Sequence, residues 1–159
     1  MGYRSSGVRM KKWYSLIDKI YDKDNLDIAF KSVKKNHGAP GIDGETVKAF
    51  AEKLEENVEF LHQALKTKTY LPSPVRRKAI EKPDGGIRLL GIPTVRDRVV
   101  QQAVVNIIEP LFDEGFHPSS YGYRPGKSQH MAVAKAQLFI KKGLTHVVDL
   151  SLIHISEPT

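Results

Sequence analysis

Apolar and polar positions along the chain follow helical spacing in most segments. A short helix is predicted over 13–23 and a second over 25–35, where Leu26, Ala29 and Val33 share a face with Phe30. A single long amphipathic helix is predicted over 45–68. Its apolar positions are Val47, Phe50, Ala51, Leu54, Val58, Leu61 and Leu65. Turn-forming residues fill 36–44, which is therefore expected to be a loop.

A β-hairpin is predicted in the middle of the chain. Its strands are expected over Val75–Lys82 and Gly86–Ile92, on either side of the turn sequence Pro83-Asp84-Gly85-Gly86. The two arms of a short ribbon can bring cations onto one face. The candidates are Arg76, Lys78, Lys82 and Arg88.

The second half of the chain returns to helical spacing. A helix is predicted to begin at Thr94, with Asp97 in the place of the usual Glu of a capping box, and to be largely buried through its apolar positions from 99 to 111. A loop over 113–127 follows, then a helix over 128–142 and a short strand over 145–150. The helix is expected to turn its apolar side chains inward, namely Met131, Ala134 and Leu138.

Composition and charge narrow the possible functions. Hydrophobic residues make up 40% of the 159 residues and charged residues 27%, which is typical of a folded globular protein. The absence of cysteine excludes disulfides and thiolate zinc sites. No apolar run reaches the length of a membrane span and no signal-peptide pattern is present, so a cytoplasmic location is expected. The net charge of +7 is concentrated in 66–98, which modestly favours a polyanionic partner such as nucleic acid, although a solvated basic surface is a common alternative.

Several side chains carry candidate chemistry, each with a simpler alternative. Lys82 and Arg88 flank the turn and can bind phosphates, although exposed hairpins commonly carry cations for solubility alone. Tyr121, Tyr123 and Arg124 can stack on nucleobases or can equally pin a long loop. The sequence around these tyrosines is no P-loop, because three residues separate its glycines where that motif needs four.

Three stretches, in this order, resemble the bacterial group II intron reverse transcriptase and maturase family. The first is Asn36-His-Gly-Ala-Pro-Gly-Ile-Asp-Gly44. The second runs from Ile80-Glu-Lys-Pro-Asp-Gly-Gly-Ile-Arg through Thr94-Val-Arg-Asp-Arg to Gln102, with Leu89 where the family usually has proline. The third is Phe116-His-Pro-Ser-Ser-Tyr-Gly-Tyr-Arg-Pro-Gly-Lys-Ser128. The resemblance covers about 13–150 and implies an α+β fold, a mostly helical fingers region with a β-hairpin and the first strand of a palm.

The resemblance also assigns roles to individual residues. Lys82 and Arg88 fall on the positions that contact the triphosphate of the incoming deoxynucleotide, which outweighs the solubility interpretation. The basic stretch would face template or intron RNA. The residues expected to contact nucleic acid are Arg76, Arg77, Lys78, Arg96, Arg98, Tyr121, Tyr123, Arg124 and Lys127.

The implied organisation is an N-terminal helical extension over 1–35, a fingers region over 36–144 and a first palm strand over 145–150. A non-native tail over 151–159 is expected, because this segment matches nothing in the family pattern. The family binds Mg²⁺ at a palm aspartate. Asp149 matches the first aspartate of that pattern, and Ser151 occupies the metal-binding position, so no intact catalytic site and no tight Mg²⁺ binding are expected.

Three functional hypotheses follow from these observations. The first is part of an RNA-directed DNA polymerase that binds RNA, a DNA primer and deoxynucleotides in the full-length protein but is inactive as this chain. The second is a non-catalytic RNA-binding module such as a splicing cofactor. The third, a helical domain with surface charge alone, is disfavoured by the specificity of the 80–102 stretch. None of these fixes the oligomeric state.

Overall fold

The computed structural model describes residues 15–83 and 85–149. The chain divides into two compact units, residues 1–111 and 112–159. The division falls beside Pro110, which lies inside helix α5 (Val95–Asp113) and has no N–H to donate to the helical carbonyl four residues before it.

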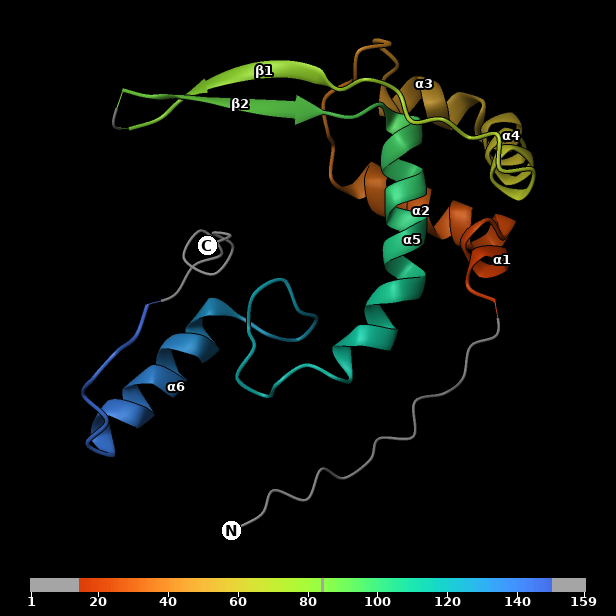
Figure 1. Ribbon diagram of the computed structural model, residues 1–159. Coiled ribbons are helices and arrows are strands. Elements are labelled where there is room, and N and C mark those ends of the chain that lie inside the picture. Colours follow the sequence, from red (N-terminus) through yellow and green to blue (C-terminus); the bar gives the residue numbers. More distant parts are fainter. Residues whose placement is uncertain (1–14, 84, 150–159) are drawn as a thin grey trace, which may run out of the picture. The chain divides into compact units, whose positions relative to one another are not determined.

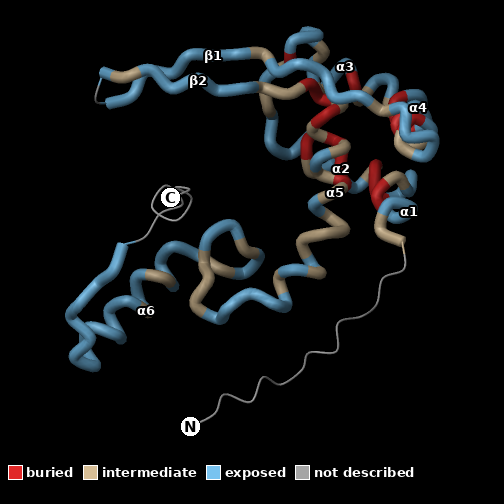
Figure 2. The backbone as a smooth tube through the Cα atoms, in the orientation of Figure 1, coloured by how far each residue is buried: buried red, intermediate tan, exposed pale blue. Residues whose placement is uncertain are grey.

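The first unit contains α1 (Ile17–Ile20), α2 (Lys23–Lys35), α3 (Val47–Glu52), α4 (Leu54–Lys66), the strands β1 (Arg76–Glu81) and β2 (Ile87–Ile92), and most of α5. Its buried residues, coloured red in Figure 2, gather where the helices meet. The rings of Phe30 on α2 and Phe50 on α3 stack at 5.2 Å between centroids. The remaining core residues are Ile20, Leu26, Ala29, Val33, Val58, Leu61, Val95, Val99 and Ala103.

The segment predicted as one helix over 45–68 is two helices, α3 and α4, separated at Lys53. In a continuous helix the carbonyl of Phe50 would accept from the N–H of Leu54. Here that carbonyl accepts from the buried Asn57 side chain at 3.2 Å and from the Lys53 N–H at 3.3 Å. The break therefore has a local cause that apolar spacing does not reveal, and the prediction of a single helix was wrong.

The predicted hairpin is confirmed, with β1 and β2 antiparallel. Figure 1 shows the two strands extending side by side away from the helices of their unit. The predicted helical segments over 25–35 and from Thr94 onward are also confirmed as α2 and α5. Only the first half of α5 is deeply buried, through Val95, Val99 and Ala103.

The second unit contains the loop after α5 and helix α6 (Gln129–Lys141), which agrees with the helix predicted over 128–142. The Ser128 side chain caps α6 by accepting from the Met131 N–H at 3.3 Å. The prediction that Met131, Ala134 and Leu138 turn inward was wrong, because no residue of α6 is buried.

Residues 144–149 do not form the strand expected over 145–150. A strand is stable only when it pairs with a neighbour. Within the described residues, β1 and β2 pair with each other and with no third strand.

The α+β fold class is confirmed by the helices and the hairpin. No helix in the described ranges combines the length and the apolar character that crossing a membrane requires.

Candidate nucleic-acid interface

The register of the hairpin decides which side chains share a face. Lys78 lies opposite Leu90, and Ile80 lies opposite Arg88. The Lys82 N–H donates to the Gly86 carbonyl at 2.8 Å, which continues the same register to the turn. Because side chains alternate between faces along a strand, four cations fall on one face. This cationic face comprises Arg76, Lys78, Lys82 and Arg88.

The cations of this face are close neighbours. Arg88 is diagonal to both Lys82 and Lys78 across the ribbon, a relation that places Cβ atoms about 7–8 Å apart or less. Lys78, Lys82 and Arg88 are exposed, and Arg76 is partly buried at the base of the hairpin. Arg77 lies on the opposite face together with Glu81. The predicted convergence of four cations is therefore present, and Arg77 is not part of it.

The turn of the hairpin fixes the position of Lys82. The Gly85 N–H donates to the Lys82 carbonyl at 3.0 Å, and Gly85 has a φ of +80°. A left-handed residue before the returning strand is typical of a hairpin with a three-residue loop, and it favours glycine at that position. The turn residues thus hold Lys82 at the end of the ladder beside Arg88.

The base of the hairpin is held by a buried carboxylate. Asp97, on the first turn of α5, accepts from the hydroxyl of Tyr70, from the Thr94 hydroxyl at 2.6 Å and from the Ser73 N–H at 3.2 Å. The Asp97 N–H donates to the Thr94 side chain at 3.1 Å, so the predicted capping pair is formed. Burial and the hydrogen bond to Asp97 raise the pKa of Tyr70. The sequence indicated the cap but gave no sign that Asp97 also binds the segment leading into β1.

The loop over 36–44 packs against the same end of α5. A Cβ on Gly41 would lie 2.6 Å from the Thr94 Cα and 2.7 Å from the Thr94 nitrogen, so only glycine allows this approach. The Arg98 guanidinium donates to the Ala39 carbonyl at 2.8 Å, and a side chain on Gly38 would collide with it. Burial lowers the pKa of Arg98. Arg98 therefore braces this loop, and its predicted contact with nucleic acid stays a prediction.

Arg96 is also partly engaged within the protein. Its guanidinium carbon lies 4.6 Å from the centroid of the Phe60 ring. Its Nε is buried without a hydrogen-bond partner among the described residues. Arg96 and Arg98 thus differ from Lys78, Lys82 and Arg88, the exposed members of the cationic face.

In the second unit, Arg124 holds the loop after α5 in place. It forms an ion pair with Asp113 at 2.6 Å, and its Nη1 donates to the carbonyls of His117 at 3.0 Å and Ser120 at 3.2 Å. The ion pair keeps the pKa of Asp113 below its usual range. Its guanidinium also lies over the ring of Phe116. For Arg124 the structure therefore supports the loop-pinning alternative.

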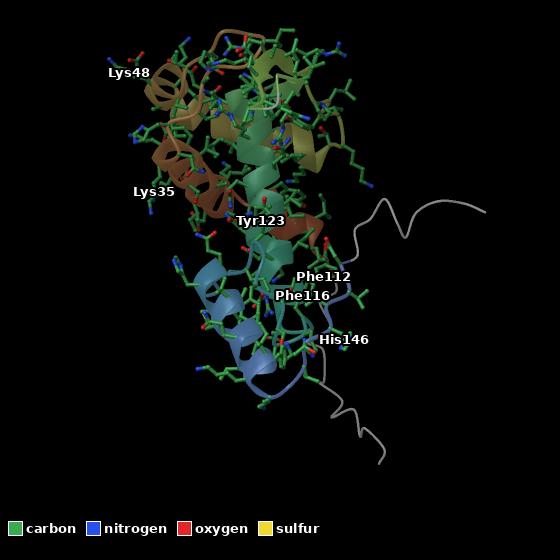
Figure 3. The ribbon with its side chains drawn as sticks, turned by 90° about the vertical axis from the view of Figure 1, so that its left-hand side faces the viewer. Lys35, Lys48, Phe112, Phe116, Tyr123 and His146 are labelled. Atoms are coloured by element: carbon green, nitrogen blue, oxygen red, sulfur yellow. The ribbon has the colours of Figure 1, made fainter. Side chains whose placement is uncertain are left out.

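The two tyrosines of this loop have different environments. Tyr123 is fully exposed and has a φ of 52°, which is uncommon for a residue other than glycine. The Tyr121 ring is partly buried, with the Lys127 ammonium 5.7 Å from its centroid. Figure 3 labels Tyr123 with Phe112 and Phe116, three exposed aromatic side chains of this unit. Tyr123 is thus available for stacking on a base.

The residues present do not fit a Mg²⁺ site within the described ranges. Asp149 is exposed in an irregular segment, and no group of three His, Asp or Glu side chains there could hold a metal. Ser151 and the tail expected over 151–159 lie outside the described residues.

Comparison with known proteins agrees with this architecture. Residues 80–153, which include most of the hairpin and all of α5, match a family model described as reverse transcriptase (RNA-dependent DNA polymerase). The chain is 38% identical over 109 residues to the group II intron-encoded protein LtrA of Lactococcus lactis. The chain belongs to the group II intron reverse transcriptase and maturase family.

Two further relatives match a similar share of the chain. Protein YkfC of Escherichia coli is 38% identical over 104 residues, and a 91 kDa protein encoded in the cob intron of Schizosaccharomyces pombe is 30% identical over 118 residues. These matches cover 65% and 73% of this chain, and the LtrA match covers 67%. The same matches cover 27% of YkfC, 18% of LtrA and 14% of the cob intron protein, so the chain spans about a quarter or less of these relatives. The family resemblance seen in the sequence is confirmed.

Proposed function

We propose that the cationic face of the hairpin binds phosphate groups for an RNA-directed DNA polymerase of the group II intron type. Lys82 and Arg88, beside the turn, would take the triphosphate of an incoming deoxynucleotide. Lys78 and Arg76, nearer the base, would contact the phosphates of template or intron RNA. The observation that carries this proposal is the register, which places all four cations on one face and Arg77 on the other.

Electrostatics supports this assignment. Four cations on one face of a ribbon repel one another, and a bound polyanion removes that repulsion while releasing its own counterions. Arginine binds phosphate oxygens through two parallel N–H donors, and lysine acts as a mobile point charge. A mixed pair such as Lys82 and Arg88 therefore suits a flexible chain of phosphates.

A comparison of adjacent substitutions tests the proposal. Fluorescence anisotropy of a labelled single-stranded RNA would be measured over a range of KCl concentrations for Lys78→Ala and Arg77→Ala. Both variants lose one positive charge, but only Lys78 belongs to the cationic face. Lys78→Ala should reduce the slope of log K against log salt by about 0.7, the contribution of one phosphate contact on a single strand. Equal effects of the two substitutions would contradict the proposal.

The nucleotide site needs its own measurement. Calorimetric titration with dATP should show weaker binding for Lys82→Ala and Arg88→Ala and little change for Arg77→Ala. The expected loss is about 1.5–3 kcal/mol for a charge-assisted contact, roughly 10-fold or more in affinity. Equal dATP affinity in all three variants would remove Lys82 and Arg88 from the nucleotide site.

A second candidate function is an RNA-binding module that supports splicing without polymerisation. It is favoured by the match to a maturase-like protein of Euglena longa, 33% identical over 89 residues. Under this alternative, RNA binding would depend on the cationic face and dATP would not bind. In both cases we expect no primer extension by this chain, because two-metal phosphoryl transfer requires several converging carboxylates.

A cytoplasmic bacterial location also stays a prediction.

A further inference from the structure

A small pocket lies between the end of α2 and the first half of α5. Its volume is about 240 Å³, and its lining residues are Val33, Asn36, Arg98, Gln101, Gln102 and Val105. The four residues from α5 are spaced three, four and seven positions apart, so they lie on one face of that helix. This α2–α5 pocket lies outside the cationic face of the hairpin.

The pocket combines apolar walls with unused amide groups. Val33 and Val105 come from different helices and supply apolar surface. The Gln102 amide nitrogen donates to the Asn106 side-chain oxygen at 2.9 Å, so part of the hydrogen-bonding capacity of Gln102 is already used. The side chains of Asn36 and Gln101 make no hydrogen bond to any other described residue. Two primary amides therefore face the pocket with both donor and acceptor groups available.

The chemistry of the lining selects among ligands. No carboxylate lines the pocket, so a divalent cation has no suitable ligand there. The single cation, Arg98, already donates to the carbonyls of Ala39 and Thr94, which reduces its capacity for a phosphate. A nucleobase has a flat apolar ring and adjacent donors and acceptors along its edge, and a primary amide can pair with such an edge through two hydrogen bonds.

We propose that the α2–α5 pocket takes one unstacked nucleobase of the RNA strand bound by the hairpin. This inference rests on the proposed RNA-binding function and adds a base contact to its phosphate contacts. Single-stranded RNA is commonly recognised in this way, with a base turned out of the stack and read along its edge. Arg98 lies one helical turn, about 6 Å, beyond Thr94, and β2 ends just before Thr94. One strand can therefore reach both sites.

Nuclear magnetic resonance of the full chain tests the pocket directly. The side-chain amide signals of Asn36 and Gln101 would be assigned from the spectra of Asn36→Ala and Gln101→Ala. Titration with adenosine monophosphate should move both signals, and ribose 5-phosphate, which has no base, should leave them in place. Equal responses to the two ligands, or no response to adenosine monophosphate, would overturn the proposal.

A binding experiment separates this proposal from the function of the hairpin. The affinity of an oligoadenylate 12-mer would be compared with that of an abasic ribose-phosphate strand of equal length. Gln101→Ala should lower the ratio of the two affinities by about five-fold, whereas Gln129→Ala, which removes an exposed glutamine of α6, should not. If the ratio of the oligoadenylate affinity to the abasic-strand affinity were unchanged in Gln101→Ala, the proposal that the pocket binds a base would be overturned. The salt slope of RNA binding, and its decrease by about 0.7 in Lys78→Ala, would still report on the hairpin. Failure of the pocket proposal and failure of the hairpin proposal are therefore distinguishable.

Discussion

Replacing Asp97 with alanine removes the acceptor that Tyr70, Ser73 and Thr94 share at the base of the hairpin. Thr94 is 1% exposed, so its hydroxyl would lose its acceptor without gaining access to water. An unsatisfied buried hydroxyl costs about 1–3 kcal/mol. Tyr70 is only partly buried and Ser73 is exposed, so water can replace part of their two charge-assisted bonds, each worth about 1.5–3 kcal/mol.

One term opposes this loss. Asp97 is 4% exposed, and its removal also removes the cost of keeping a carboxylate away from water. The hydrogen-bond losses exceed that gain, because the carboxylate is well supplied with donors. We therefore expect Asp97→Ala to lower the free energy of unfolding by about 2–4 kcal/mol, a large part of the stability of a domain of this size. Asp97→Asn keeps the shape and one acceptor, and should lose about half as much.

The assay is urea denaturation of the full chain followed by far-ultraviolet circular dichroism. Asp27→Ala is the matched control, since Asp27 is a partly buried helical aspartate whose side chain makes no hydrogen bond or ion pair to another described residue. The control should stay within about 0.5 kcal/mol of the unsubstituted chain. If Asp97→Ala matched this control, Asp97 would not hold the base of the hairpin.

Two further predictions concern the same region. Gly41→Ala should destabilise the chain by about 1–3 kcal/mol, because its new Cβ would meet the backbone of Thr94 at 2.6 Å. The cost of this clash exceeds the roughly 0.4–1 kcal/mol of stability gained by restricting the unfolded chain. Gly122→Ala, which meets open space, should be neutral or slightly stabilising in the same urea titration. The raised pKa of Tyr70 means that the folded state favours the neutral phenol, so this contribution is complete below the ordinary pKa of 10.0 and decreases as pH rises above it. Urea titrations at about pH 8 and about pH 11 should show that the free energy of unfolding falls by up to 1.4 kcal/mol per pH unit, and that it falls less in Tyr70→Phe. Equal decreases in Tyr70→Phe and in the unsubstituted chain would contradict the assignment of this pH dependence to Tyr70.

The sequence was most informative where the cause of structure is local. Alternation along the strands and the Pro83 to Gly86 turn predicted the hairpin, and the same alternation indicated that cations could share a face. The spacing of Thr94 and Asp97 predicted the helix cap. Each of these depends on residues close in sequence, so the pattern contains the necessary information.

The features that sequence reasoning missed depend on contacts between distant segments or on a choice between equivalent contacts. The binding of Tyr70 by Asp97 joins residues 27 positions apart. Arg124 could have stacked on a base or bonded to carbonyls, and its pairing with Asp113 becomes evident only in the folded chain. Helical spacing in α6 indicates an apolar face but not what covers it, which explains why its side chains were wrongly expected to be buried.

The first half of α5 connects the two proposed sites. Its N-terminal turn binds the entry to β1 through Asp97 and the 36–44 loop through Thr94 and Arg98. Its next two turns line the α2–α5 pocket through Gln101 and neighbouring residues. A two-stranded ribbon is marginally stable alone and gains its fixed direction from what holds its base. If the phosphate and base contacts act on one RNA strand, loosening this anchor at Asp97 should weaken both together, whereas substitutions within either site should affect that site alone.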